Sequence, residues 1–160
     1  MDAATTNFIE RMGLVLESDG LPRIAGRMFG LLLISPDPHS LDDLAADLKV
    51  SKGSVSTNAR LLEQRGLLER VCRPADRRDY YSVPPDLFTR TMAQRLARWQ
   101  RFHEAIGSAR GLLPLLSSEV RQRLEEYEEA YGFMSQVIRD ALARWQASRK
   151  DRPAKVGASR

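Results

Sequence analysis

The segment from Lys49 to Val71, KVSKGSVSTNARLLEQRGLLERV, constrains the fold of this chain more than any other. Its apolar positions recur at the helical spacings of four and three, at Val55, Ala59 and Leu62. The first half is nevertheless rich in glycine, serine, threonine and asparagine, which are poor helix formers. Ser51 is a favourable N-cap, and Gly66 is a favourable C-terminal glycine. The sequence therefore predicts a short helix whose exposed face carries small hydrogen-bonding groups at the expense of helix stability.

The neighbouring segments place this helix in a recognisable order. SLDDLAADL predicts a preceding short helix, in which Ser40 is the cap and Asp43 completes a capping box. Two short β runs follow, LLERV and YYSV, and the arginine-rich CRPADRR joins them as a hairpin. Helix, tight turn, helix and hairpin form a winged helix–turn–helix. The predicted fold class is therefore mainly α with a small β-hairpin wing, combined with long dimerisation helices.

The sequence as a whole predicts four regions. Residues 1–19 form an N-terminal helix capped by Thr5 or Thr6 and expected to assist dimerisation, and residues 20–83 form the winged helix–turn–helix. Residues 84–149 form a helical dimerisation domain, with helices over 86–109 and from Ser117 or Ser118 to 149. Residues 150–160 lack apolar content and are expected to be a disordered tail.

Charge is concentrated around the unusual helix. From Lys49 to Arg78 there are eight basic and three acidic residues, whereas the whole chain has a net charge of only +4. The entire positive excess thus lies in this segment. Such a patch is typical of a protein that binds a polyanion, although a solubilising surface would have the same composition.

In a winged helix–turn–helix, the second helix enters the major groove of DNA with its N-terminal residues near the base edges. Asn58 is suited to adenine, and Lys52 to guanine or phosphate. Wing arginines can enter the minor groove or bind phosphates, with Asp76 orienting one of them. The expected DNA-binding residues are Ser51, Lys52, Gly53, Ser54, Ser56, Thr57, Asn58, Arg60, Arg73, Arg77 and Arg78. The alternatives are a surface helix with incidental polar residues and an exposed turn with solvated arginines.

These residues carry a family resemblance. SLDDLAADLKVSKGSVSTNARLLEQRGLLERV followed by PADRR resembles the MarR family of bacterial transcriptional regulators. GLPRIAGRMFGLLLISPDPHSLDDLA with SKGSVSTNARLLEQRGL looks more narrowly like the GbsR-type branch. The resemblance covers roughly residues 7–83 and implies a dimeric winged-helix regulator of double-stranded DNA, often a repressor and sometimes released by a small ligand. GbsR-like proteins include choline-responsive ones, but no pattern here indicates a choline site.

The last helix contains an apolar seam with a period of 3.5 residues. The seam consists of Val120, Leu124, Tyr127, Tyr131, Met134, Ile138, Ala141 and Trp145. A seam held for more than three heptads is typical of helices that pack against another helix. We expect these residues to form a homodimer interface; packing of the helices within one chain is the alternative.

Several single residues suggest a sensing role. Trp99 and Phe102 are expected to line a pocket for a small apolar or cationic effector between the winged and helical regions. The simpler interpretation of aromatic residues at helical spacing is core packing. His103 and Cys72 could sense pH and oxidants, although a hydrogen-bonded histidine and an ordinary thiol are the simpler interpretations. The two histidines and one cysteine have no metal-site spacing, so no metal or other cofactor is expected.

Other functional classes fit poorly. The chain lacks a phosphate-binding glycine loop, a G-x-S-x-G elbow and an H-E-x-x-H motif, so an enzyme is not expected. It has no apolar run of membrane-spanning length and no export signal, and its single cysteine suits a reducing cytoplasm. The remaining rival is a winged helix that contacts another protein and does not bind specific DNA sequences.

Overall fold

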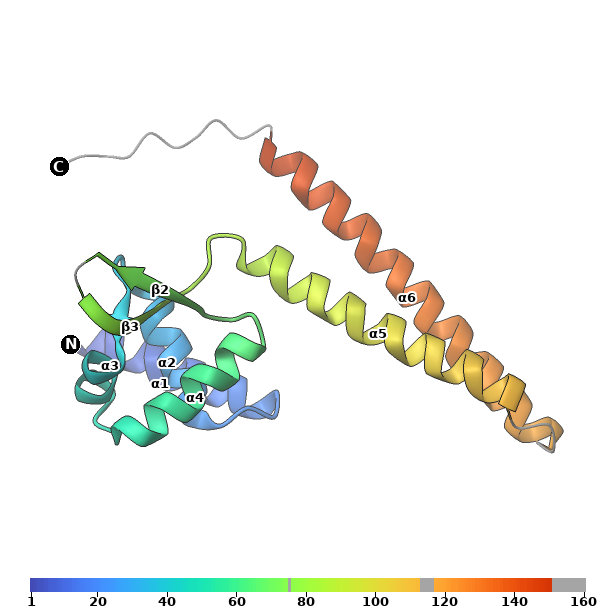
Figure 1. Ribbon diagram of the computed structural model, residues 1–160, viewed down its shortest axis with the longest axis horizontal. Helices are drawn as coiled ribbons and strands as arrows, with labels where there is room; N and C mark the ends of the chain where they lie inside the picture. Colours follow the sequence, from blue (N-terminus) through green and yellow to red (C-terminus); the bar gives the residue numbers. More distant parts are fainter. Residues whose placement is uncertain (75, 113–116, 151–160) are drawn as a thin grey trace. The chain divides into compact units, whose positions relative to one another are not determined.

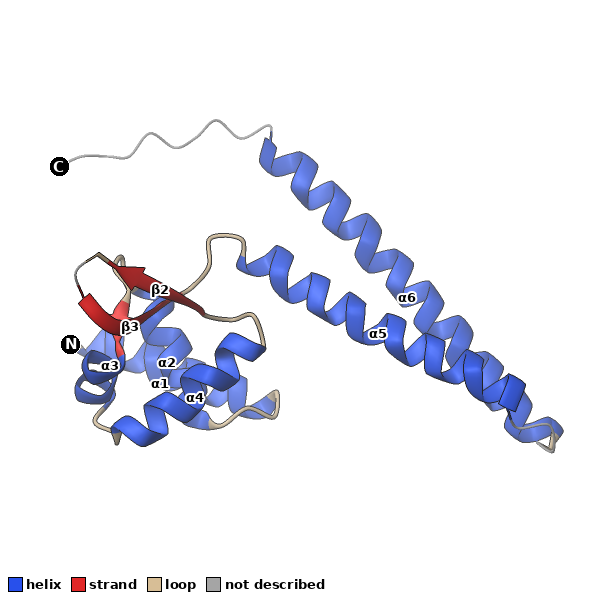
Figure 2. Cartoon of the chain, viewed as in Figure 1, coloured by secondary structure: helices blue, strands red, loops and turns tan. Residues whose placement is uncertain are grey.

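The computed structural model of the chain describes residues 1–74, 76–112 and 117–150, and its contacts divide into two compact units at Thr91 and Met92. Figure 1 shows the elements in chain order, and Figure 2 shows that helices predominate. The elements are α1 (Ala3–Ser18), α2 (Arg23–Ile34), β1 (His39–Ser40), α3 (Leu41–Leu48), α4 (Lys52–Gln64), β2 (Glu69–Arg73), β3 (Asp76–Ser82), α5 (Leu87–Leu112) and α6 (Ser118–Lys150). The mainly helical fold with a small β wing is confirmed.

The first unit has a continuous apolar core. Residues from α1, α2, α3, α4 and β3 meet in it, and Met28 and Leu44 are fully buried. The predicted inward positions of α4 are confirmed, because Val55, Ala59 and Leu62 have no exposed surface. Burial of one complete face of α4 leaves only its opposite face for function.

Close helix packing joins α1 to α2. A Cβ added at Gly26 would lie 2.6 Å from the backbone oxygen of Met12 and 2.7 Å from the Cα of Gly13. The contact is therefore between backbones, and a side chain would prevent it. The prediction that Thr5 or Thr6 caps α1 is wrong: Asp2 is the N-cap, and its carboxylate accepts a hydrogen bond of 2.7 Å from the Thr5 amide.

The turn between α3 and α4 follows the sequence prediction. Ser40 and Asp43 form the reciprocal capping box at the start of α3, and the Ser51 side chain accepts from the Ser54 amide at the start of α4. Lys49 ends α3 in the left-handed region, with φ of 54°. Gly66 follows α4 with φ of 68°, which confirms its predicted role after the helix.

The wing is a three-stranded antiparallel sheet in the order β1–β3–β2. The predicted hairpin of β2 and β3 is present. The sequence analysis did not identify β1, because two residues are too few to show strand alternation. Tyr80 lies in the central strand, opposite Ser40 of β1 and Val71 of β2. The wing is thus attached to the N-cap of α3.

The second unit is formed by α5 from Met92 onward and α6. Within it, the Nδ1 atom of His103 lies 3.1 Å from the backbone oxygen of Glu128, which joins the two helices. The α5 helix continues to Leu112, beyond the predicted end at Ala109. The predicted tail lies outside the described residues except for Lys150. No helix in the described part of the chain is long and apolar enough to cross a bilayer.

Candidate nucleic-acid interface

The outer face of α4 presents the polar groups that the sequence predicted. Ser51, Lys52 and Gly53 are exposed at its start, and Thr57 and Arg60 are exposed one and two turns later. Ser54 and Ser56 are half-buried. A Cβ at Gly53 would meet no atom within 4 Å. Internal packing therefore does not require glycine at this position, although glycine disfavours the helix.

Asn58 has a different environment from its neighbours. Its residue is 7% exposed, and its Nδ2 atom donates to the backbone oxygen of Ser54 at 2.8 Å. Its Oδ1 atom is buried and has no hydrogen-bond partner among the described residues. An acceptor suited to the adenine amino group thus remains unused. A base contact by Asn58 stays a prediction, and it requires the side chain to turn outward.

Local contacts hold the other polar groups of α4. Lys52 Nζ lies 2.8 Å from Asp42 Oδ1 in α3, and Arg60 Nη2 donates to Ser56 Oγ at 3.0 Å. Both pairs are exposed, so their net contributions to stability are small. An anion can therefore compete for either cation without opening the protein core.

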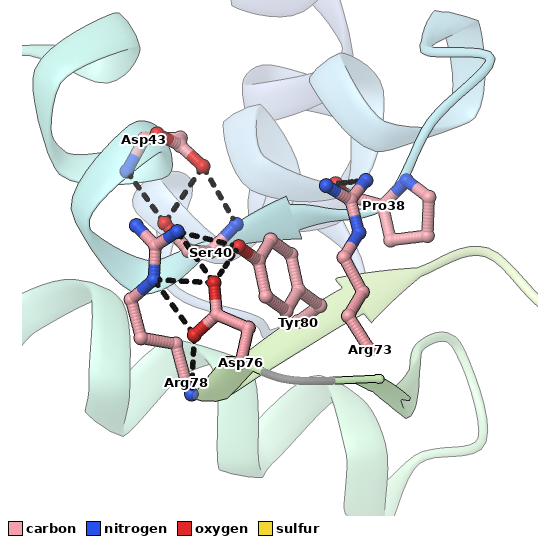
Figure 3. A network of polar contacts seen from close by, with 7 residues as sticks. All are labelled: Pro38, Ser40, Asp43, Arg73, Asp76, Arg78 and Tyr80. Carbon is pink, nitrogen blue, oxygen red and sulfur yellow. Dashed lines mark hydrogen bonds and ion pairs between the residues drawn. The ribbon is translucent and has the colours of Figure 1, made fainter.

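The wing contains the most connected polar network, shown in Figure 3. Arg78 donates from Nε and Nη2 to the Asp76 carboxylate, at 3.0 and 2.6 Å to Oδ2. Its Nη2 atom also donates to the Tyr80 hydroxyl at 2.7 Å, and this hydroxyl donates to Asp76 Oδ2 at 2.8 Å. The three side chains therefore form a closed triangle.

Arg73 and Arg77 of the wing differ from Arg78. The Arg73 guanidinium lies 4.3 Å above the Tyr80 ring centroid and donates to the backbone oxygen of Pro38 at 3.1 Å. Arg77 is exposed, and its side chain makes no hydrogen bond or ion pair with any residue that the structure describes. The fourth arginine of the wing, Arg70 in β2, lies 3.4 Å from Asp79. Among the described residues, three wing arginines therefore have a partner and Arg77 has none.

The network shifts the ionisation of its members. Hydrogen bonds from Arg78 hold the pKa of Asp76 well below its usual value, and the same pairing raises the pKa of Arg78. The hydrogen bond to Asp76 raises the pKa of Tyr80. Both ions and the neutral phenol are thus the favoured forms at neutral pH, which keeps the triangle intact.

Tyr80 and Asp42 were not predicted as partners of the expected DNA-binding residues. A signal for Tyr80 was present, because Asp76, Arg78 and Tyr80 alternate along β3 and must share one face of the strand. The contact of Asp42 with Lys52 spans the turn between two helices, and no spacing rule within one helix reveals it.

The predicted seam of α6 divides into two sets within the second unit. Ile138 is buried, and Leu124 and Tyr131 are half-buried. Val120 is also half-buried, whereas the other four seam residues are exposed: Tyr127 by 53%, Met134 by 39%, Trp145 by 36%, and Ala141. Part of the seam thus serves packing within the chain, as the alternative interpretation proposed.

The residues expected to bind an effector lie among aromatic rings. Phe102 stacks on Tyr131 with ring centroids 4.9 Å apart, and Trp99 meets Tyr131 edge to face at 6.3 Å. Phe102 remains 52% exposed, whereas Trp99 is half-buried. The described residues contain no cluster of side chains able to hold a metal ion.

Comparison with known proteins identifies relatives that match most of the chain. Residues 19–79 match the MarR family model, and residues 86–148 match the model of MmpR5-like MarR family transcriptional regulators. The HTH-type transcriptional regulator MmpR5 of Mycobacterium tuberculosis is 34% identical over 139 residues, which cover 86% of this chain and 84% of the relative. The HTH-type transcriptional repressor OpcR of Bacillus subtilis is 22% identical over 155 residues, which cover 86% and 84%.

The fold has a close counterpart among solved structures. A crystal structure described as a transcriptional regulator has a TM-score of 0.83 and 33% identity, and the match covers 90% of this chain and 99% of that one. The relatives are transcriptional regulators and not enzymes. Both parts of the sequence, the winged region and the two long helices, match family models. This chain belongs to the MarR family of transcriptional regulators.

Proposed function

We propose that this protein is a dimeric repressor that binds a pseudo-palindromic DNA operator through α4 and the arginine-rich wing. The observation that carries the proposal is the two-faced construction of α4. Its inner face is fully buried, whereas its outer face combines Lys52 and Arg60 with small polar residues and a glycine that packing does not require. Such a face suits close approach to the major groove. One relative, OpcR, is named as a repressor, which supports repression in preference to activation.

The homodimer is supported by apolar surface on α6. Tyr127, Met134 and Val137 are exposed by 39% to 53%, and they recur with Ala130 and Ala141 at spacings of three and four. This is the pattern of a helix that has a further helical partner. A two-fold dimer would present two copies of α4 to half-sites about one DNA turn apart.

Operator binding is tested by fluorescence anisotropy with genomic fragments selected against random DNA. We expect dissociation constants of about 10⁻⁸ to 10⁻¹¹ M for specific sites. Lys52→Ala should reduce discrimination between sites. Arg77→Ala should weaken binding to all DNA and reduce the salt slope by about one. Arg121→Ala, which removes an exposed cation from α6, is the control and should leave both measurements unchanged.

A winged helix that contacts only another protein is the alternative. It predicts no enrichment of any genomic fragment at moderate salt, together with equal, weak affinity for all duplexes. The basic excess from Lys49 to Arg78 favours DNA instead.

We also propose that the protein responds to a small-molecule effector and belongs to the GbsR-like branch of the family. Trp99 and the exposed Phe102 are the residues proposed to contact a small apolar or cationic molecule, because aromatic faces attract cations. The chain has two tryptophans, so Trp145→Phe leaves Trp99 as the single reporter. Choline, betaine and lipophilic compounds are titrated against its fluorescence, and each compound that binds is added to the operator assay. Unchanged operator affinity with every such compound would indicate a constitutive regulator.

A further inference from the structure

One buried aromatic side chain serves two arginines of the wing. Tyr80 is 3% exposed and lies in the central strand, between β1 and β2. Its hydroxyl is shared by Arg78 and Asp76, and its ring lies beneath the guanidinium of Arg73. Figure 3 shows the hydroxyl between Asp76 and Arg78, with Arg73 on the other side of the ring.

We propose that Tyr80 is a positioning residue for DNA recognition, which holds Arg78 through its hydroxyl and Arg73 through its ring before DNA is bound. The inference rests on the proposed function. Its physical basis is the flexibility of arginine, whose long side chain loses conformational freedom when it binds. A guanidinium that is already oriented loses less of this freedom on contact with DNA.

The geometry leaves part of Arg78 available. Its Nε and Nη2 atoms are bound to Asp76 and Tyr80, whereas Nη1 makes no hydrogen bond within the described part of the chain. Nη1 can therefore donate to a phosphate or base acceptor while the triangle stays closed. Asp76 alone would hold the Nε and Nη2 atoms of Arg78 through a single side chain at the start of β3, beside the turn. Tyr80 adds a bond from the middle of the sheet.

The sheet also links this triangle to the helix–turn–helix. Tyr80 pairs with Ser40, which caps α3 through the Ser40–Asp43 box. The Arg73 side chain reaches the backbone of Pro38, two residues before Ser40. Orientation of both arginines is thus tied to the strand that leads into α3, and through the turn to α4.

The decisive variant is Tyr80→Phe, which keeps the ring and removes only the hydroxyl. Tyr81→Phe is the matched control, because Tyr81 is the next residue, is 4% exposed and makes no hydroxyl hydrogen bond with any described residue. We expect Tyr80→Phe to weaken specific operator binding by about 5- to 10-fold, since the hydrogen bonds of the hydroxyl with Arg78 and Asp76 are lost and the guanidinium is less firmly held. Tyr81→Phe should change it by less than about twofold.

Two readouts separate positioning from a general structural role. All charges are retained in Tyr80→Phe, so the slope of log affinity against log salt should stay that of the wild type while affinity falls. In an Arg78→Ala background, adding Tyr80→Phe should have less than about a twofold effect, because the residue it positions is gone. A full 5- to 10-fold effect in that background would overturn the inference.

A further variant covers the case in which Tyr80→Phe unfolds. Arg78→Lys keeps the charge but cannot bind Asp76 and Tyr80 with a planar fork, so it should also lower affinity without changing the salt slope. If the wild type binds a specific operator and either folded variant binds it equally well, the inference fails and the proposed function stands. If the wild type enriches no operator, the proposed function itself fails, and the inference fails with it.

Discussion

The two units of this protein use their apolar side chains in different ways. All the buried apolar residues except Ile138 belong to the first unit, among the residues that the structure describes. Among the described residues, each unit exposes six large apolar side chains: Met1, Leu14, Val15, Leu33, Ile34 and Phe88 in the first, and Phe102, Tyr127, Phe133, Met134, Val137 and Trp145 in the second. A patch of this kind marks an interaction surface. The two units therefore differ in buried core and not in exposed apolar surface. The winged unit builds a core from one chain, whereas the helical unit has only Ile138 as a buried apolar residue among those described, so most of its apolar surface is left for a second chain to cover.

The largest expected effect is on stability, and it tests whether the winged unit has a closed core. Leu62→Ala removes a fully buried side chain of α4 and should lower the free energy of unfolding by about 2–5 kcal/mol. Leu33→Ala in α2, at a residue that is 44% exposed, should change it by less than about 0.5 kcal/mol. Urea unfolding followed by circular dichroism measures both. Equal effects would show that the core of this unit is not closed in solution.

The winged unit was also the part best predicted from sequence. Ser40, Ser51 and Gly66 act locally, so their capping and turn roles follow from residue type and spacing. The N-cap of α1 was assigned wrongly because Asp2, Thr5 and Thr6 are all favourable cap residues and lie within five positions of one another. The β1 strand was missed because its existence depends on pairing with β3, which is distant in sequence.

The second prediction tests whether the exposed face of α6 holds two chains together. Val137→Asp introduces a charge at a position that is 43% exposed in the single chain, so the helix itself tolerates it. In a dimer interface the same charge would be buried without a partner. We expect a monomer and about 100-fold weaker operator binding, because the advantage of two linked half-sites is lost.

Gln122→Asp is the matched control for Val137→Asp. It introduces the same charge at another exposed residue of α6, outside the exposed apolar set of Tyr127, Ala130, Met134, Val137 and Ala141. Sedimentation velocity gives the mass of each variant, and anisotropy gives its operator affinity. A dimer of wild-type affinity for Val137→Asp would show that the exposed apolar face of α6 is not the dimer interface.

The candidate site could be predicted only in outline. Residue types along α4 and the hairpin predicted a polar, cationic surface, and the helix period predicted which side of α4 is buried. The individual contacts depend on three-dimensional neighbours: Asn58 bonds back to its own helix, and Arg78 is held by Tyr80. The α6 seam shows the same limit, because a period of 3.5 residues predicts a helical partner without saying whether α5 or a second chain provides it.

The third prediction compares glycines of the two units. Gly26→Ala in α2 would place a Cβ within 2.7 Å of backbone atoms of α1, which cannot move aside as a flexible side chain can. We expect a loss of about 1–3 kcal/mol in the free energy of unfolding. Gly132→Ala in α6 meets only the His103 ring, at 3.7 Å, and should gain up to about 1 kcal/mol from helix propensity. Denaturant midpoints compare the two; losses of similar size would show that the helices of the second unit pack as closely as α1 and α2.

The smallest expected effect is that of Gly53→Ala in α4. This variant tests whether the glycine serves DNA binding at the expense of helix stability. Gly53→Ala meets no atom within 4 Å, so it should raise the free energy of unfolding by up to about 1 kcal/mol, as Gly132→Ala does. The two variants should differ in DNA binding. An added methyl group at Gly53 would stand between α4 and the groove and should weaken operator affinity severalfold, whereas Gly132→Ala should leave it unchanged. Melting temperatures and operator titrations on the same samples measure both quantities. If Gly53→Ala gained stability and kept full affinity, close approach of DNA at the start of α4 would no longer explain the glycine. The unfavourable helix composition of that segment would then need another cause.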